Sequence, residues 1–295
     1  MSDTRLVLDN VSVTYRITRG WTRISVPAVK NVSLVLEASR TLALIGESGS
    51  GKTTITNAIL GLSTISSGRI AFGGSTLCDV ALGTNRAAHQ PGIQVVMQDP
   101  LSSFNPRYRL LSSLAIPMRM GGIKDRDELR DRLEKLANRV GISPGLLEKY
   151  PHQLSGGQLQ RLSIARAISV APQLIVADEP ASKLDVSVRA QVLNLLKDVI
   201  EESGMSLLLI THDLDVARFL CTDVAVMHFG KILETGTMNK VFAAPGHEYT
   251  KTLLASSSES NAANPHPQAA IPADGFVGGI TGPRPSTLAL KAASP

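Results

Sequence analysis

Gly46-Glu47-Ser48-Gly49-Ser50-Gly51-Lys52-Thr53 is the stretch that decides the fold, because it reads G-x-x-x-x-G-K-T, the pattern of a phosphate-binding loop. The short apolar run at residues 41–45 precedes it and predicts a buried strand. Residues 54–60 follow it and can continue as a helix. A strand, a glycine-rich turn and a helix N-terminus are the parts that such a site requires. The sequence therefore predicts a nucleoside triphosphate site in an α/β fold.

Each part of this loop has a chemical task. Glycine lets the backbone turn successive N–H groups inward, where they donate to phosphate oxygens. The Lys52 ammonium can reach the β- and γ-phosphates, and the Thr53 hydroxyl can ligate Mg²⁺. We therefore expect ATP or GTP as the ligand. The expected nucleotide-binding positions of the loop are Gly46, Glu47, Ser48, Gly49, Ser50, Gly51, Lys52, Thr53 and Thr54.

The composition is that of a globular protein with a real core. The chain has 295 residues, of which 43% are hydrophobic. No run approaches the roughly 18 apolar residues of a membrane-spanning helix, and residues 1–10 predict no secretory signal. The cysteines, Cys78 and Cys221, lie far apart and predict neither a disulfide framework nor a zinc site, which fits a reducing cytoplasm. The net charge of +5 comes without a basic run, which favours a solvated surface over a nucleic-acid or membrane site.

Two segments ahead of the loop alternate apolar and polar residues. Residues 6–17 and 29–36 therefore predict strands of a small antiparallel sheet. We expect residues 16–27, which include Gly20 and Trp21, to form a loop between them.

Two side chains on strands outside the loop are further candidates. An aromatic ring at Tyr15 could stack on a nucleotide base, although this segment alone favours a half-buried strand tyrosine. After an expected loop at residues 73–91, the buried strand at 92–97 ends at Gln98. A polar side chain at the carboxyl end of a parallel strand is well placed to face a ligand.

Helical periodicity replaces the strand patterns in residues 102–170. Apolar residues recur at helical spacing in 110–120 and 125–140, which predicts a helical subdomain inserted into the sheet. Its last helix opens at Ser155, a residue type favoured at N-caps, and Gly156-Gly157 leave backbone N–H groups exposed. This helix start is either a second anion site or an ordinary capped helix.

Two later strands carry polar side chains at their carboxyl ends. The apolar residues 174–177 run into Asp178 and Glu179, at the place where a P-loop protein holds Mg²⁺. Asp178 fits the metal role, and Glu179 could orient or deprotonate an attacking water. The strand at 206–210 is followed by His212, which could donate to the γ-phosphate, although a lone histidine there is more often structural.

The C-terminal part changes in composition. The expected elements before the change are strands at 224–227 and 231–234 and helices at 238–243 and 247–255. We expect one domain over residues 1–255. Residues 256–295 are rich in Ser, Ala, Pro, Gly and Asn, which predicts a flexible tail. Its apolar clusters, Phe276-Val277 and 288–290, leave a docking segment as the alternative to a plain disordered extension.

Taken together, these residues resemble the nucleotide-binding subunit of an ABC transporter. Residues 154–158 match the LSGGQ signature in full, and they lie shortly before the acidic strand end. The other matched positions are Gln98 as the Q-loop, Ser182-Lys183-Leu184-Asp185 as the D-loop, His212 as the switch histidine and Tyr15 as the adenine-stacking aromatic. The resemblance covers residues 5–255. It implies a P-loop NTPase of ABC type, with a RecA-like core sheet, an N-terminal antiparallel β-subdomain and the helical insertion.

The resemblance also implies a mechanism. Adenine would stack on Tyr15, and Mg²⁺ would be held by Thr53 with Asp178 behind it and Gln98 as a further contact. Glu179 would polarise water, and His212 would contact the γ-phosphate. Two subunits would face head to tail, so that one chain completes the site of the other. The completing residues would be Ser155, Gly156, Gly157 and Gln158.

The implied partners are a second ABC ATPase subunit, in a heterodimer or a homodimer, two transmembrane permease subunits and an extracytoplasmic solute-binding protein. No nucleic-acid partner is implied. The implied location is the cytoplasmic face of the inner membrane, as a peripheral subunit.

A narrower resemblance points to the oligopeptide, dipeptide and nickel uptake group. Residues 98–107 resemble its QDPxxSLNPR stretch, and His247-Glu248-Tyr249-Thr250 resembles its HPYT, with glutamate in place of proline. This implies import of di- or oligopeptides, with nickel or an opine-like solute as the alternative. Two features depart from the group: Lys183 stands where alanine is usual, and no cysteine follows Cys221, so no iron–sulfur cluster is expected.

Two other classes of function are alternatives to a transport ATPase. A soluble ABC ATPase acting on DNA or ribosomes typically carries a long coiled-coil or zinc insertion, or two ATPase halves, and this sequence has neither. A non-catalytic partner subunit would have a degenerate site, whereas the expected residues Lys52, Asp178, Glu179 and His212 are all present.

Overall fold

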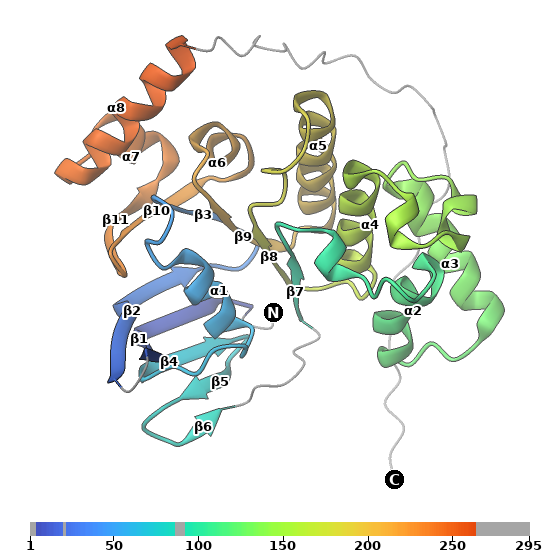
Figure 1. Cartoon of the computed structure of the whole chain (residues 1–295), viewed down its shortest axis with the longest axis horizontal. Helices are drawn as coiled ribbons and strands as arrows, with labels where there is room; N and C mark the ends of the chain where they lie inside the picture. The colour runs from blue at the N-terminus through green and yellow to red at the C-terminus, as the bar shows by residue number, and fades with distance from the viewer. Residues whose placement is uncertain (1–3, 20–21, 86–91, 264–295) are drawn as a thin grey trace.

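The computed structural model describes residues 4–19, 22–85 and 92–263. It consists of two β-sheets and a group of helices beside them (Figure 1). Trp21 and most of the expected tail, with Phe276-Val277 and 288–290, lie outside the described residues.

The core sheet has the strand order β11-β10-β3-β9-β8-β7. Its strands are β3 (Thr41–Ile45), β7 (Ile93–Val96), β8 (Leu174–Asp178), β9 (Ser206–Thr211), β10 (Asp223–His228) and β11 (Lys231–Thr237). All neighbours pair in parallel except β11, which is antiparallel to β10. In register, Ile45 pairs with Thr211 and Asp178 with Ile210. The carboxyl ends of β3, β8 and β9 therefore meet at one edge of the sheet, where ligands bind in open α/β sheets.

The second sheet is antiparallel, with the strand order β2-β1-β4-β5-β6. Its strands are β1 (Leu6–Arg19), β2 (Thr22–Leu36), β4 (Ser67–Phe72), β5 (Ser75–Asp79) and β6 (Thr84–Asn85). Two predictions of loops are wrong, because strands form in these segments. Residues 16–19 and 22–27 belong to a long β1–β2 hairpin, and β5 and β6 lie within the expected loop 73–91, of which residues 86–91 are outside the description.

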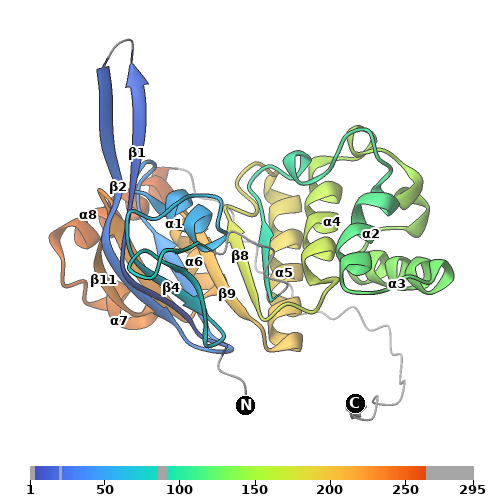
Figure 2. The ribbon, with the colours of Figure 1, turned by 90° about the horizontal axis from the view of Figure 1, so that it is seen from below.

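The hairpin forms despite Pro27 because β2 is an edge strand. Proline cannot donate to a strand ladder, so sheets tolerate it at an edge, and here Pro27 pairs with Thr14. The pairs Tyr15–Val26 and Ile17–Ile24 continue the same register outward. Figure 2 shows the end of the hairpin standing clear of the rest of the fold as a two-stranded ribbon.

Apolar side chains pack on both faces of the core sheet. Between the two sheets, Leu44 and Ile210 are buried with Ile55 of α1 (Lys52–Ile59). The opposite face is covered by α5 (Val186–Ser203), α6 (Leu214–Leu220), α7 (Met238–Ala243) and α8 (Glu248–Ala263). Helix α6 is not among the expected elements, although Asp213 marks its start: the Asp213 carboxylate accepts from the N–H groups of Asp215 and Val216, each at 3.0 Å.

The helical part has a core of its own, which includes Leu114, Leu133 and Leu162. Its elements are η1 (Leu101–Ser103), α2 (Leu110–Met120), α3 (Arg126–Arg139), η2 (Pro144–Glu148), η3 (Pro151–Gln153) and α4 (Gly156–Ile168). Helix α4 packs on α5 and β7, so it joins this core to the sheet. Arg166 of α4 donates to the Ser103 carbonyl, and its guanidinium lies 5.3 Å from the centroid of the Phe104 ring.

Helix α8 continues past residue 256, where the flexible tail was expected to begin. Ser256 itself is within this helix, and its hydroxyl donates to the Leu253 carbonyl at 3.0 Å. Among the described residues, no helix combines the length and apolarity needed to cross a bilayer.

Candidate functional site

The glycine-rich loop joins β3 to α1 and has the backbone shape that phosphate binding requires. Gly46 has φ 151° and Gly51 has φ 109°. A Cβ at Gly46 would lie 2.1 Å from the Met227 carbonyl oxygen, and one at Gly51 would lie 2.6 Å from the Ala28 carbonyl oxygen. Only glycine fits these two positions, because a side chain would displace the neighbouring backbone.

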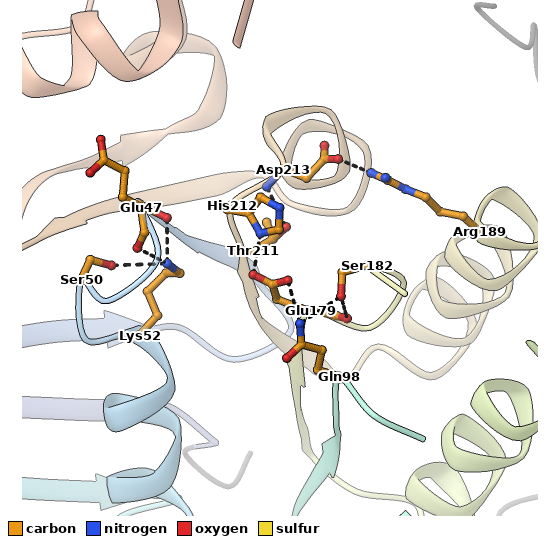
Figure 3. A network of polar contacts seen from close by, with 11 residues as sticks. Glu47, Ser50, Lys52, Gln98, Glu179, Ser182, Arg189, Thr211, His212 and Asp213 are labelled. Atoms are coloured by element: carbon orange, nitrogen blue, oxygen red, sulfur yellow. Dashed lines mark hydrogen bonds and ion pairs between the residues drawn. The ribbon is translucent and has the colours of Figure 1, made fainter. Parts of the chain in front are cut away.

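Lys52 lies buried inside the curl of this loop. Its ammonium donates to the carbonyl oxygens of Gly46 at 2.7 Å and Glu47 at 2.8 Å, and to the Ser50 hydroxyl at 3.3 Å (Figure 3). Burial lowers the pKa of Lys52, whereas the charges of Glu179, Asp178 and Glu47 oppose that shift. The Lys52 ammonium is therefore positioned where it could exchange the carbonyl oxygens of Gly46 and Glu47 for the negatively charged oxygens of a triphosphate.

Asp178 and Thr53 meet beside the lysine. The Thr53 hydroxyl hydrogen-bonds to the Asp178 carboxylate at the end of β8. Burial raises the pKa of Asp178, and the repulsion from Glu179 adds to it, while the Thr53 bond and the charge of Lys52 oppose the rise. A buried carboxylate next to a threonine hydroxyl is a partial set of ligands for a hard cation such as Mg²⁺.

Glu179, Gln98 and His212 converge from three strand ends, as Figure 3 shows. The Glu179 Oε1 atom lies 2.6 Å from His212 Nδ1, and its Oε2 atom accepts from Gln98 Nε2 at 3.3 Å. Gln98 also donates to the Ser182 hydroxyl at 3.3 Å. The sequence suggests Ser182 only as part of the D-loop, whereas the structure places its hydroxyl against the Gln98 side chain. The structure thus gathers the expected water-activating group, its histidine and the Q-loop glutamine into one network.

A small cavity of about 60 Å³ lies next to this network. Glu179 and His212 line it together with Arg189 and Asp213, which form an ion pair. Burial alone would raise the pKa of Asp213, but the Val216 N–H and Arg189 outweigh it and lower the pKa. A polar cavity of this volume has room for water molecules. Water can therefore lie within reach of the Glu179 carboxylate.

The signature residues stand apart from the loop within one chain. The Ser155 hydroxyl accepts from the Gln158 N–H at 3.3 Å, and the Gln158 side chain accepts from the Ser155 N–H at 3.0 Å, which is a complete capping box. Ser155 and Gly156 are exposed at the start of α4. In Figures 1 and 2, strands of the core sheet separate α4 from α1. The structure therefore does not bring the signature residues to the loop of the same chain.

Tyr15 lies on β1 near the base of the projecting ribbon. Its hydroxyl is 3.2 Å from the Ser63 hydroxyl, and 39% of the residue is exposed. The ring is therefore accessible to a planar ligand, as the base-stacking expectation requires.

Tyr249 contacts the loop through its side chain, although no sequence pattern predicts this contact. Tyr249 of α8 accepts a hydrogen bond from the Glu47 N–H at 3.2 Å. The resemblance to HPYT was the only signal at this position, and it carries no information about which part of the fold the tyrosine meets.

The residues present fit Mg²⁺ with a nucleotide rather than a metal held by protein alone. Within the described ranges, no group of three or more His, Cys, Asp or Glu side chains is arranged so that it could hold a metal ion. Mg²⁺ commonly takes one or two protein oxygens and completes its shell with phosphates and water. Thr53 and Asp178 would supply the protein oxygens, with Gln98 as a further contact.

Comparisons with known proteins identify the family. A family model described as "ABC transporter" matches residues 29–182. The chain is 43% identical over 228 residues to the oligopeptide transport ATP-binding protein OppF of Salmonella typhimurium, covering 77% of this chain and 68% of that protein. It is 43% identical over 232 residues to the dipeptide transport ATP-binding protein DppF of Lactococcus lactis, covering 78% and 74%.

A solved structure shares the fold. The ATP-binding cassette MJ0796, in a dimeric post-hydrolysis state with ADP and phosphate, superposes with a TM-score of 0.68 and 29% identity. The superposition covers 79% of this chain and 98% of that one.

Proposed function

Because this chain belongs to the ABC transporter family and is an ATPase coupled to transport, we propose that it energises the import of di- or oligopeptides from the cytoplasmic face of the inner membrane. The relatives named for oligopeptide and dipeptide transport support the choice of solute. As a peripheral subunit, it would act with two permease subunits and a solute-binding protein.

One observation carries the proposed site: Lys52, Asp178 and Glu179 lie at a single edge of the core sheet, together with His212. In this site, the loop N–H groups and Lys52 would bind the phosphates. Thr53 and Asp178 would hold the Mg²⁺, with Gln98 as a further contact. ATP hydrolysis needs a positioned water and compensation of the phosphate charge. Glu179 acts on the water, with His212 holding the carboxylate from one side.

We propose that a second ATPase subunit completes the site. The exposed N-terminus of α4 is a donor for phosphate oxygens, and it lies across the sheet from the loop of its own chain. A head-to-tail pair would place Ser155 to Gln158 of each chain against the nucleotide of the other. The group that the sequence resembles often pairs two different ATPases, which favours a heterodimer.

Calorimetry with Mg-ATP tests the nucleotide site. The Lys52→Ala variant removes the buried ammonium, and we expect ATP binding to fall by at least tenfold, since a charge-assisted contact contributes about 1.5–3 kcal/mol. Unchanged binding would refute the proposed site. The exposed Lys251→Ala variant is a matched control, because Lys251 pairs with Glu248 on the surface of α8.

Proteoliposomes test the solute. The chain would be reconstituted with the permease subunits and the solute-binding protein that co-purify with it. Stimulation of ATP hydrolysis by short peptides, and not by nickel or an opine, is the expected result. Stimulation by nickel or an opine alone would contradict the peptide assignment, and co-purification with ribosomes or DNA instead of permeases would contradict the transport role.

A further inference from the structure

Tyr249 connects the C-terminal helix to the first peptide of the phosphate-binding loop. Its hydroxyl accepts from the Glu47 N–H at 3.2 Å, across 202 positions of sequence. The Gly46 carbonyl belongs to the same peptide group, and it accepts from Lys52 at 2.7 Å. The Gly46–Glu47 peptide is therefore held from both sides: its N–H by Tyr249 and its carbonyl by Lys52.

Nucleotide binding would affect the Lys52 contact and the Tyr249 contact differently. Lys52 would have to turn its ammonium from the loop carbonyls of Gly46 and Glu47 toward the phosphates. The peptide would then lose its partner on the carbonyl side. The Tyr249 hydroxyl, in contrast, would not have to leave the Glu47 N–H for the phosphates. Its hydrogen bond can therefore hold the orientation of the peptide both with and without bound nucleotide.

Tyr249 is itself held firmly in place. Its ring stacks on the His228 ring, with 3.8 Å between centroids and 29° between planes. The segment before it is anchored to β11, because the Glu234 carboxylate accepts from the N–H groups of Gly246 at 2.8 Å and His247 at 3.2 Å. A hydroxyl on such an anchored ring loses little entropy when it makes its hydrogen bond.

The strands that anchor Tyr249 also touch the loop directly. His228 ends β10, and Gly230, in the turn after it, donates to the Ser50 carbonyl at 2.8 Å. The Gly230 carbonyl in turn accepts from the Lys30 N–H at 2.8 Å. One β10–β11 turn thus supports the loop at Ser50, and the ring stacked on His228 supports it at Glu47.

We propose that Tyr249 is a positioning residue for the phosphate-binding loop, and that its hydroxyl sets the affinity for the nucleoside triphosphate by fixing the Gly46–Glu47 peptide. The inference rests on the proposed role of this loop in binding phosphate. It gives α8 a task in the nucleotide site, although the helix is far from that site in sequence.

The test compares variants of the full-length chain by calorimetry with Mg-ATP and by steady-state ATPase kinetics. Tyr249→Phe removes only the hydroxyl and keeps the ring on His228. We expect its Kd and KM for ATP to rise about threefold to tenfold, the value of one hydrogen bond, with kcat unchanged. Tyr249→Leu also removes the ring stack, so we expect a rise at least as large, together with a lower melting temperature.

Two controls make the outcomes distinct. Tyr108→Phe removes a hydroxyl from an exposed tyrosine of the helical part, and we expect wild-type affinity. Lys52→Ala reports on the loop itself. If Lys52→Ala binds ATP normally, the proposed nucleotide site fails. If Lys52→Ala is defective while Tyr249→Phe binds as wild type, the inference about Tyr249 alone is overturned.

The melting temperature tests whether the role of Tyr249 is purely structural. The melting temperature of Tyr249→Phe is expected to match that of Tyr108→Phe. A drop in melting temperature in Tyr249→Phe, with kcat and affinity falling together, would assign Tyr249 to packing and overturn the inference.

Discussion

The Glu179 Oε1 atom lies 2.6 Å from His212 Nδ1 in the proposed hydrolytic centre. Glu179 has φ 47°, in the left-handed region that a residue with a side chain rarely adopts. Its N–H donates to the Ile210 carbonyl at 2.9 Å, which ties this conformation to β9. A strained backbone of this kind costs of order 1–3 kcal/mol and is common at functional sites. Here the conformation turns the Glu179 carboxylate toward His212, while Asp178 lies buried beside Thr53.

Replacing Glu179 by glutamine separates binding from hydrolysis. The amide keeps the shape of the side chain but cannot take a proton from water, so we expect kcat to fall by about 10²–10⁴. ATP binding is expected to remain, and the closed dimer should accumulate with ATP on size-exclusion chromatography. Glu201→Gln, on the exposed side of α5, is the matched control. Normal turnover in Glu179→Gln would remove Glu179 from the mechanism.

Removing the His212 ring tests whether Glu179 needs its neighbour. The His212 side chain is 60% exposed, so His212→Ala should change the free energy of unfolding by less than about 0.5 kcal/mol. We expect kcat to fall by about 10²-fold with little change in KM. Steady-state kinetics measures both values, and His152→Ala, at another exposed histidine, should behave as wild type. A rise in KM at constant kcat would instead make His212 a ground-state binding group.

Asp178 makes stability depend on pH. Because burial raises its folded pKa above the unfolded value, the unfolded state loses this proton first as the pH rises, and the folded state is penalised above the folded pKa. The penalty disappears as the pH falls below the unfolded pKa. In the absence of nucleotide, Asp178→Asn should therefore raise the melting temperature at neutral pH. The gain should shrink in acid.

Thermal scans against pH measure this effect, with Asp198→Asn on exposed α5 as the control. The same Asp178→Asn variant should lose the Mg²⁺ dependence of ATP binding, because it removes a carboxylate ligand. An Asp178→Asn protein that melts lower than wild type at neutral pH would show that the carboxylate charge stabilises the fold, against this expectation.

Arg166 ties the signature helix to the segment after Gln98. Its guanidinium donates to the Ser103 carbonyl and lies over the Phe104 ring, and burial lowers its pKa. Arg166→Met keeps the apolar stem and leaves the carbonyl without its donor. We expect the free energy of unfolding to fall by about 2–3 kcal/mol in urea titrations, against little change for exposed Arg119→Met. Equal effects of the two variants would contradict this role.

Much of the fold follows from local patterns, and the errors have physical reasons. The strand, loop and helix around Lys52 are as expected, since apolar runs and glycine positions specify neighbouring backbone directly. The prediction of a loop at residues 16–27 was wrong because Pro27 and Gly20 usually break strands, and sequence cannot say that β2 lies at a sheet edge. Helix α6 was overlooked, although Asp213 is a residue type favoured at N-caps.

The sequence by itself determined which chemical groups this protein has: the loop, the acidic strand end, the histidine and the signature, each readable within a few residues. Only the tertiary structure decided which groups meet. The contacts of Glu179 with His212 and Gln98 arise because parallel strands β7, β8 and β9 align their carboxyl ends. The contact of Tyr249 with Glu47 arises because α8 packs back beside β10. Such contacts depend on the chain topology, which brings distant residues together. They cannot be inferred from the spacing of neighbouring residues in the sequence.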